Sequence, residues 1–165
     1  AQIYLEQLGG GKAIQNVACW TGLEAIDYIL GQKAGEAERR QIAATIHAES
    51  IRDCGIEPVD LCTILMNLLD NAIEGAEKCP AYMEKRMDIT IRHIHQFILS
   101  NVKNSAAAPP VQQNGRLVTT KKEKWLHGWG LKSVQSAAEK YDGTVEYGYA
   151  DSVFSVSVML FIHKV

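Results

Sequence analysis

The sequence lacks any apolar run of the roughly 18 residues that a membrane-spanning helix requires. It has no secretory signal pattern at its start. Its net charge of −2 gives no basic excess, so we expect no direct nucleic-acid partner. The chain begins with Ala rather than Met, as expected for a piece cut from a longer protein. These absences therefore say nothing about the rest of that protein.

Paired cysteine motifs are also missing. The four cysteines show no Cys-x-x-Cys spacing, and none lies near a histidine at the spacing of a metal site: Cys19, Cys54, Cys62 and Cys79. Free thiols in a reducing cytosol are the expected state of such residues.

The chain does have enough apolar residues for a core, at 47% of 165 residues, which fits one domain with a short appendage. Periodicity predicts helices over 21–35, 58–78 and 130–141, the first with Thr21 as N-cap. It predicts strands over 41–48, 87–91, 97–102, 144–149 and 153–162. Residues 105–127 show no periodicity. This order predicts an α+β sandwich of two layers, with helices on one face of a mixed sheet.

Two asparagines stand out in the second predicted helix. Asn67, Asn71 and Glu74 follow the spacing i, i+4, i+7 and lie along one line of the helix, opposite its leucines. Asparagine is a mediocre helix former, so the pair suggests a use for short neutral oxygens. Mg²⁺ beside a triphosphate takes such oxygens. A solvated helix face, or amides that cap nearby backbone, remains the alternative.

The segment from 67 to 74, Asn-Leu-Leu-Asp-Asn-Ala-Ile-Glu, resembles the N-box of GHKL proteins, which include gyrase, heat-shock chaperones and sensor histidine kinases. The resemblance implies that Asn71 is the Mg²⁺ ligand and that Asn67 is the catalytic position four residues earlier. Gyrase-type hydrolases carry a glutamate there as general base, and an amide cannot accept a proton usefully at neutral pH. Asn67 therefore favours phosphoryl transfer to a protein over hydrolysis. Glu74 is typical of the accessory-gene-regulator, quorum-sensing branch.

A glycine pair forms the second motif, in the segment His127-Gly128-Trp129-Gly130-Leu131. Glycines at a helix start let backbone amides approach an anion closely, although a lone pair is weak evidence. About sixty residues after the N-box, it resembles the G2 box that holds the triphosphate in GHKL domains. The preceding loop then corresponds to the ATP lid. Lys121 and Lys122 are its candidates for closing over the phosphates, with a solvated charge run as the alternative, and His127 contacts phosphate or caps the helix.

The adenine motif departs from the family pattern. GHKL proteins usually carry Asp-x-Gly-x-Gly after the central strand, and its Asp receives the adenine amino group. Here Asn104 stands at that place and the glycines are missing, as in the accessory-gene-regulator branch. An amide oxygen accepts the same hydrogen bond without the charge.

The resemblance implies a Bergerat-type ATP-binding kinase domain over 21–165, and 1–20 as the remnant of an upstream helical segment. It implies ATP and Mg²⁺ as cofactors and transfer of the γ-phosphoryl to a histidine on a dimerisation domain outside this chain. The five histidines, His47, His93, His95, His127 and His163, lie in predicted strands, turns or the lid, not on a helix beside an acidic residue. The implied parent is a membrane-anchored homodimeric sensor whose cytoplasmic kinase domain serves a response regulator.

Two alternatives remain at this level. The altered adenine motif also fits a degenerate GHKL module that regulates or binds another protein without using ATP. A serine kinase of the anti-sigma type has a similar size and fold, but normally keeps the Asp and glycines. Binding of Mg-ATP, measured by calorimetry, separates the first alternative from an active kinase.

Overall fold

The computed structural model describes residues 20–109, 112–113, 116–117 and 129–162. Its helices are α1 (Glu24–Arg39), α2 (Pro58–Glu77) and α4 (Trp129–Glu139). The strands are β1 (Ala43–Ala48), β2 (Arg86–Ile94), β3 (Phe97–Ser105), β4 (Gln112–Gln113), β5 (Arg116–Leu117), β6 (Thr144–Ala150) and β7 (Val153–Phe161). None of the helices in these stretches is long and apolar enough to cross a membrane.

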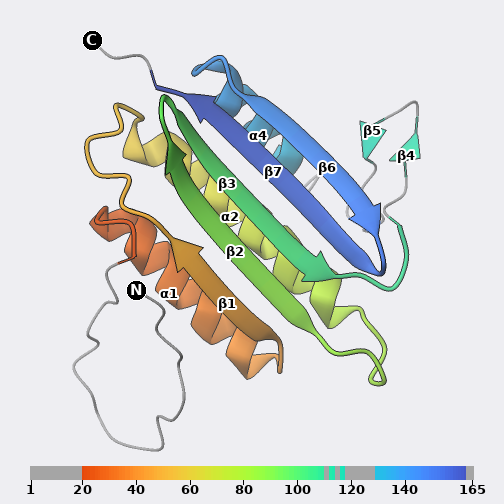
Figure 1. Ribbon diagram of the computed structural model, residues 1–165. Coiled ribbons are helices and arrows are strands. Elements are labelled where there is room, and N and C mark those ends of the chain that lie inside the picture. The colour runs from red at the N-terminus through yellow and green to blue at the C-terminus, as the bar shows by residue number, and fades with distance from the viewer. Residues whose placement is uncertain (1–19, 110–111, 114–115, 118–128, 163–165) are drawn as a thin grey trace, which may run out of the picture.

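Five of the strands form one mixed sheet in the order β1-β2-β3-β7-β6. β1 runs parallel to β2, because α2 crosses between them, and the other neighbours are antiparallel. β2 and β3 form a hairpin around His95, whose φ of 54° suits a tight turn. β4 and β5 pair separately. The three helices lie behind this sheet in Figure 1, so the predicted α+β class with helices on one face is confirmed.

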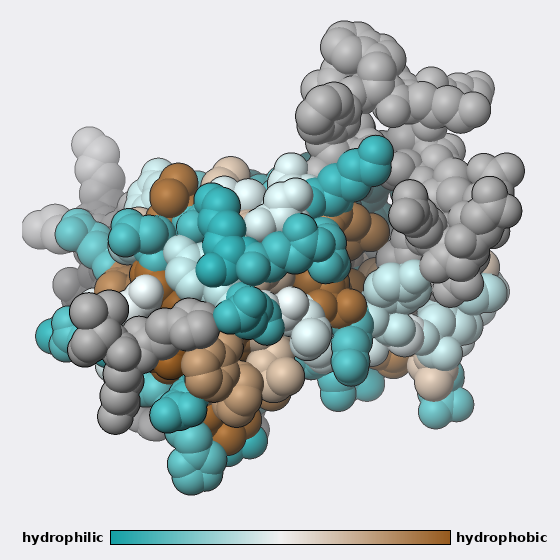
Figure 2. All heavy atoms as spheres, turned by 90° about the horizontal axis from the view of Figure 1, so that it is seen from above, coloured by the Kyte–Doolittle hydropathy of each residue, from teal (hydrophilic) through white to brown (hydrophobic). Residues whose placement is uncertain are grey.

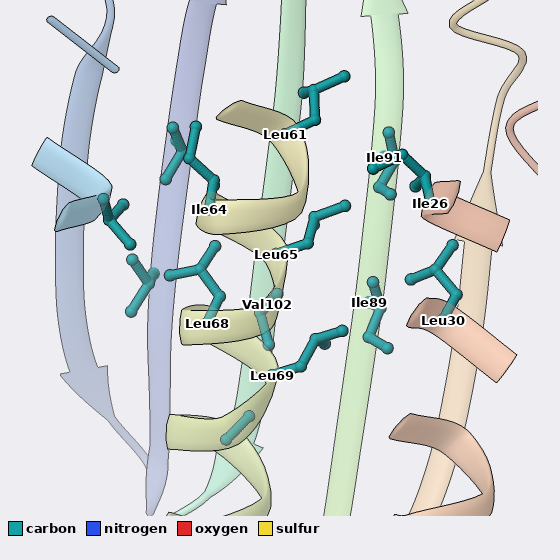
Figure 3. Close-up of a cluster of buried hydrophobic side chains, with 14 of the residues drawn as sticks. Ile26, Leu30, Leu61, Ile64, Leu65, Leu68, Leu69, Ile89, Ile91 and Val102 are labelled. Carbon is teal, nitrogen blue, oxygen red and sulfur yellow. The ribbon is translucent and has the colours of Figure 1, made fainter. Parts of the chain in front are cut away.

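The core lies between the sheet and the helices, with α2 at its centre. Figure 3 shows Leu61, Leu65 and Leu69 of α2 pointing toward β2 and α1, while Ile64 and Leu68 point toward β7 within the same core. All five are almost fully buried. Pro58 begins α2, because its fixed φ suits the first helical turn and its missing N–H is not needed there. This helix therefore has one side fixed by apolar packing.

The start of α1 differs from the sequence prediction. Thr21 is not the N-cap, which is Leu23 and makes no side-chain capping bond. Thr21 is buried instead, and both its backbone N–H and its hydroxyl donate to Asp27 Oδ1 at 2.7 Å. Gly22 N donates to the other Asp27 oxygen at 3.2 Å. The carboxylate of Asp27 thus holds the segment that leads into the helix, while the Thr21 hydroxyl accepts from Leu23 N at 3.2 Å.

Ion pairs join α1 to the exposed side of α2. Lys33 pairs with Asp70, and Arg40 pairs with Glu77 at 2.6 Å. The pKa of Lys33 is raised despite its partial burial, since Asp70 and Glu36 both stabilise its charged form. These two ion pairs therefore bridge the two helices at the protein surface.

No helix among the residues that the structure describes covers the outer face of the sheet. Its side chains alternate with those of the core, and many are polar and exposed, such as Arg92 and Lys103. Phe97 and Phe161 contact each other edge to face at the hairpin end of this sheet, with ring centroids 5.3 Å apart. Figure 2, which is turned by 90° from Figure 1 and therefore does not look onto this face, shows hydrophobic and hydrophilic residues interleaved on the side seen from above.

Candidate functional site

Asn67 lies where α2 meets the start of α4. Its amide nitrogen donates to the carbonyl of Thr63 at 2.7 Å, one turn back along the helix. Its oxygen is directed at Gly130 of α4, so that a Cβ added to this glycine would lie only 2.9 Å from Oδ1. Gly130 therefore permits the close approach of the two helices at this point. The two predicted motifs, far apart in sequence, meet here.

Asn71 follows one turn later on the same side of α2. It is exposed, and its side chain makes no hydrogen bond to any residue that the structure describes. Four residues advance the helix by about 6 Å, which separates it from Asn67 along the axis. An amide oxygen in this state is available to a ligand.

Asn104 lies at the other end of this line. It is on the inner face of β3, between Met87 of β2 and Phe154 of β7, and is only 4% exposed. Its Nδ2 donates to the carbonyl of Ser105 at 2.8 Å. A Cβ added to Gly75 of α2 would lie 2.6 Å from the same nitrogen. A glycine inside a helix costs about 1 kcal/mol relative to alanine, and this contact gives it a structural reason.

The three α2 positions share one side of the helix. Asn67, Asn71 and Gly75 follow i, i+4, i+8 and extend over about 12 Å of helix axis. Gly130 lies at one end of the line and Asn104 at the other. The arrangement is an elongated surface with amide groups along it, a glycine-bearing helix start at one end and a buried amide at the other.

A polar cluster fixes the far end of α4 against α2. The buried carboxylate of Asp60 accepts from Lys140 Nζ and from the Tyr141 hydroxyl, both at 2.7 Å. The Tyr141 oxygen in turn accepts from Glu57 N at 3.0 Å. The sequence did not indicate this cluster, because its members are about 80 residues apart in the chain.

The hydrogen bond from Lys140 lowers the pKa of Asp60, and the hydrogen bond from Tyr141 and the charge of Lys140 lower it further. Burial opposes this by raising the pKa. In the unfolded chain the pKa of Asp60 is about 3.9. At pH values between the folded and the unfolded pKa, the unfolded chain binds more protons than the folded one, so the free energy of unfolding rises with pH. The contribution is complete from about pH 5 upward, one unit above the unfolded pKa, and is lost as the pH falls through the folded pKa. The free energies of unfolding of the wild type and Asp60→Asn, measured with urea, should therefore differ most above about pH 5 and converge as the pH falls below it. A difference that stays constant from pH 7 to pH 2 contradicts this prediction.

The remaining predicted site residues divide into two groups. Leu131 is half-buried in α4, directly after Gly130. Four others lie outside the described residues: Lys121, Lys122, His127 and Gly128. Gly75 is the position that sequence reasoning did not select, and its signal was a glycine in the interior of a helix.

The chemistry of the donors fits a hydrated magnesium ion. Among the residues that the structure describes, no group of three or more His, Cys, Asp or Glu could hold a metal by itself. Mg²⁺ usually takes only one or two protein oxygens and completes its octahedron with water and phosphate. The exposed amide oxygen of Asn71 suits that mode of binding.

Comparison with solved structures identifies the class of fold. The catalytic domain of the histidine kinase ThkA aligns with a TM-score of 0.65 and 18% identity, over 84% of this chain and 91% of that one. The histidine kinase domain of EL346 from Erythrobacter litoralis aligns with a TM-score of 0.64 and 13% identity, over 93% of this chain and 66% of that one. The histidine kinase AdeS from Acinetobacter baumannii aligns with a TM-score of 0.59 and 12% identity, over 88% of this chain and 66% of that one. The fold is therefore that of histidine kinase catalytic domains.

The sequence also matches the profile of the GHKL domain over residues 56–161, from just before α2 to the end of β7. The chain belongs to the GHKL family. No curated protein sequence matches it significantly. The described site residues all lie within the matched stretch, whereas α1 and β1 precede it. The assignment to the accessory-gene-regulator branch stays a prediction.

Proposed function

We propose that this domain binds Mg-ATP and is the catalytic domain of a histidine kinase, which transfers the γ-phosphoryl group to a histidine on a separate dimerisation domain. The observation that carries the proposal is the contact of Asn67 Oδ1 with the start of α4 at Gly130. It joins the amide-bearing side of α2 to a helix start, where backbone N–H groups favour phosphate.

Different residues of the chain bind the base, the cation and the phosphates of the nucleotide. Asn104 accepts a hydrogen bond from the base at the buried end, and Asn71 supplies its amide oxygen to the cation. The α4 start at Gly130 and Leu131 orients the phosphates, together with Gly128, His127, Lys121 and Lys122. The cation, when bound, neutralises phosphate charge. Catalysis then rests on positioning and charge neutralisation rather than on covalent chemistry by the protein.

Asn67 decides the fate of the phosphoryl group in this proposal. Its nitrogen is already used by Thr63 and its oxygen faces Gly130. An amide held in this way orients but cannot deprotonate water. Transfer to a protein histidine is therefore favoured over hydrolysis.

The acceptor histidine belongs to another part of the full-length protein in this proposal. His47 lies in β1 and His93 in β2, and His95 lies in the turn between β2 and β3. None of these three is on a helix, as the histidine of a helical hairpin must be. His127 and His163 are outside the described residues, as are residues 1–19 of the predicted upstream segment. The dimerisation domain, a homodimeric membrane-anchored parent and a response regulator remain parts of the proposal.

Two measurements test the function. Calorimetry with Mg-ATP should show saturable binding by this domain. Incubation with radiolabelled ATP and a supplied histidine-bearing helical hairpin should label the hairpin, while the domain alone should not label itself. Binding no tighter than millimolar, with no labelled hairpin, would instead favour the degenerate regulatory module.

A further inference from the structure

We propose that Gly75 is a positioning residue that sets purine specificity by leaving the space in which the Asn104 amide nitrogen is held, so that this amide offers its oxygen to the base. The inference rests on the proposed nucleotide site and adds a residue that the N-box and the glycine motif do not contain. It concerns which atom of Asn104 faces the ligand. A carboxylate at this place would have no such choice, because both its atoms are acceptors.

Gly75 leaves the space that the nitrogen end of the amide occupies. From an ideal Cβ at this glycine, Asn104 Nδ2 is 2.6 Å away, Cγ is 3.5 Å and Oδ1 is 3.9 Å. The nitrogen thus occupies the space in which any other residue would begin its side chain. Alanine at this position requires the amide to move, because real Cβ atoms do not approach a nitrogen so closely.

The backbone beside Asn104 holds the same nitrogen. Nδ2 donates to the carbonyl of Ser105 at 2.8 Å. Ser105 itself is fixed to the segment before β2, since its hydroxyl donates to Glu84 O at 2.8 Å and accepts from Arg86 N at 3.0 Å. The Asn104 oxygen accepts no hydrogen bond from the described part of the chain.

A rotation of the amide by 180° is opposed by these contacts. It would turn the oxygen toward the Ser105 carbonyl and place two acceptors against each other. The rotation would break the hydrogen bond to Ser105 and leave this carbonyl facing another acceptor, which costs more than a typical hydrogen bond contributes. The orientation with the oxygen free is therefore the stable one, and it remains stable only while position 75 carries no side chain.

Base selection follows from this orientation. The exocyclic amino group of an adenine-type purine is a donor and matches the free oxygen. The 6-oxo group of a guanine-type purine is an acceptor and meets another acceptor. We expect the site to bind ATP in preference to GTP, although it lacks the charge of an aspartate.

The experiment measures Mg-ATP and Mg-GTP affinities of the wild type, Gly75→Ala, Asn104→Ala and the double variant. Gly75→Ala should weaken ATP binding at least tenfold and bring the ATP-to-GTP ratio close to one. The double variant should be no weaker than Asn104→Ala alone, because Gly75 acts through Asn104. Gly35→Ala in α1 is the matched control, since its Cβ would meet only Arg39 Nη1 at 3.5 Å, and it should bind like the wild type.

The outcomes separate this inference from the proposed function. If the wild type prefers ATP and Gly75→Ala keeps both affinities, or if the two substitutions are additive, the inference is overturned and the kinase proposal stands. If the wild type binds neither nucleotide, both are overturned. If Gly75→Ala does not fold, the inference is tested on the wild type by hydrogen exchange of the Asn104 side-chain amide. One Asn104 side-chain amide proton, assigned by its loss in Asn104→Ala, should stay protected from exchange when Mg-ATP binds, and loss of protection overturns the inference.

Discussion

Substitution of Asn71 by alanine should lower phosphotransfer to a supplied helical hairpin by at least roughly 100-fold, with the fold intact. The reason is that the exposed amide oxygen is the protein's contact with the cation in the proposed site. Weakening even the groups that support a metal ligand costs about 10- to 100-fold, and loss of the ligand itself should cost no less. Initial rates of hairpin labelling at saturating Mg-ATP measure the effect.

Asn101→Ala is the matched control for this prediction, because it makes the same chemical change on the outer face of the sheet. There the Asn101 amide donates to Ser157 Oγ, away from α2. It should keep phosphotransfer within a few fold of the wild type. Thermal unfolding of Asn71→Ala should match that of the wild type, since the side chain is exposed. Equal phosphotransfer rates for Asn71→Ala and Asn101→Ala would reject the assigned role.

The largest loss of stability is expected from Leu65→Ala. Leu65 is 1% exposed and points from the middle of α2 toward β2 and α1. Truncation of a buried leucine removes apolar contacts and leaves a cavity, at a cost of about 3 kcal/mol. That is a large part of the 5–15 kcal/mol that typically stabilises a domain of this kind. Urea unfolding followed by circular dichroism gives the difference in free energy of unfolding.

Met66→Ala is the neighbouring control on the same helix. Met66 is 45% exposed, about 100° around the helix from Leu65, so its truncation removes little buried surface. We expect a change of less than about 1 kcal/mol. Similar losses for the two variants would mean that the core does not lie on the side of α2 described above.

Local signals predicted much of the fold. Pro58 and Pro80 bracket α2, and the alternation of Met87, Ile89 and Ile91 gives β2 its buried face. These features depend on residues that are near neighbours in the chain, so a single sequence contains them. The asparagine spacing likewise placed Asn67 and Asn71 on one side of the helix before any tertiary information was used.

Features that depend on distant contacts were not predictable in the same way. The Gly75–Asn104 contact joins residues 29 positions apart, and the Asp60 cluster with Lys140 joins residues 80 positions apart. A glycine in a helix and an acidic residue in its first turn each have common local explanations. Thr21 shows the same problem, because its role is decided by the carboxylate of Asp27 and not by its own propensity as a cap.

The apolar packing of α2 also determines the azimuth of its asparagines. A residue inserted between Leu61 and Asn67 would turn everything after it by about 100°, so that a leucine would face water and an asparagine would move toward the sheet. The packing of the leucines therefore limits how far α2 can rotate about its axis, and with it the positions of the asparagines. Any rotation of α2 that disturbed its buried leucines would displace Asn67 and Asn71 by the same angle.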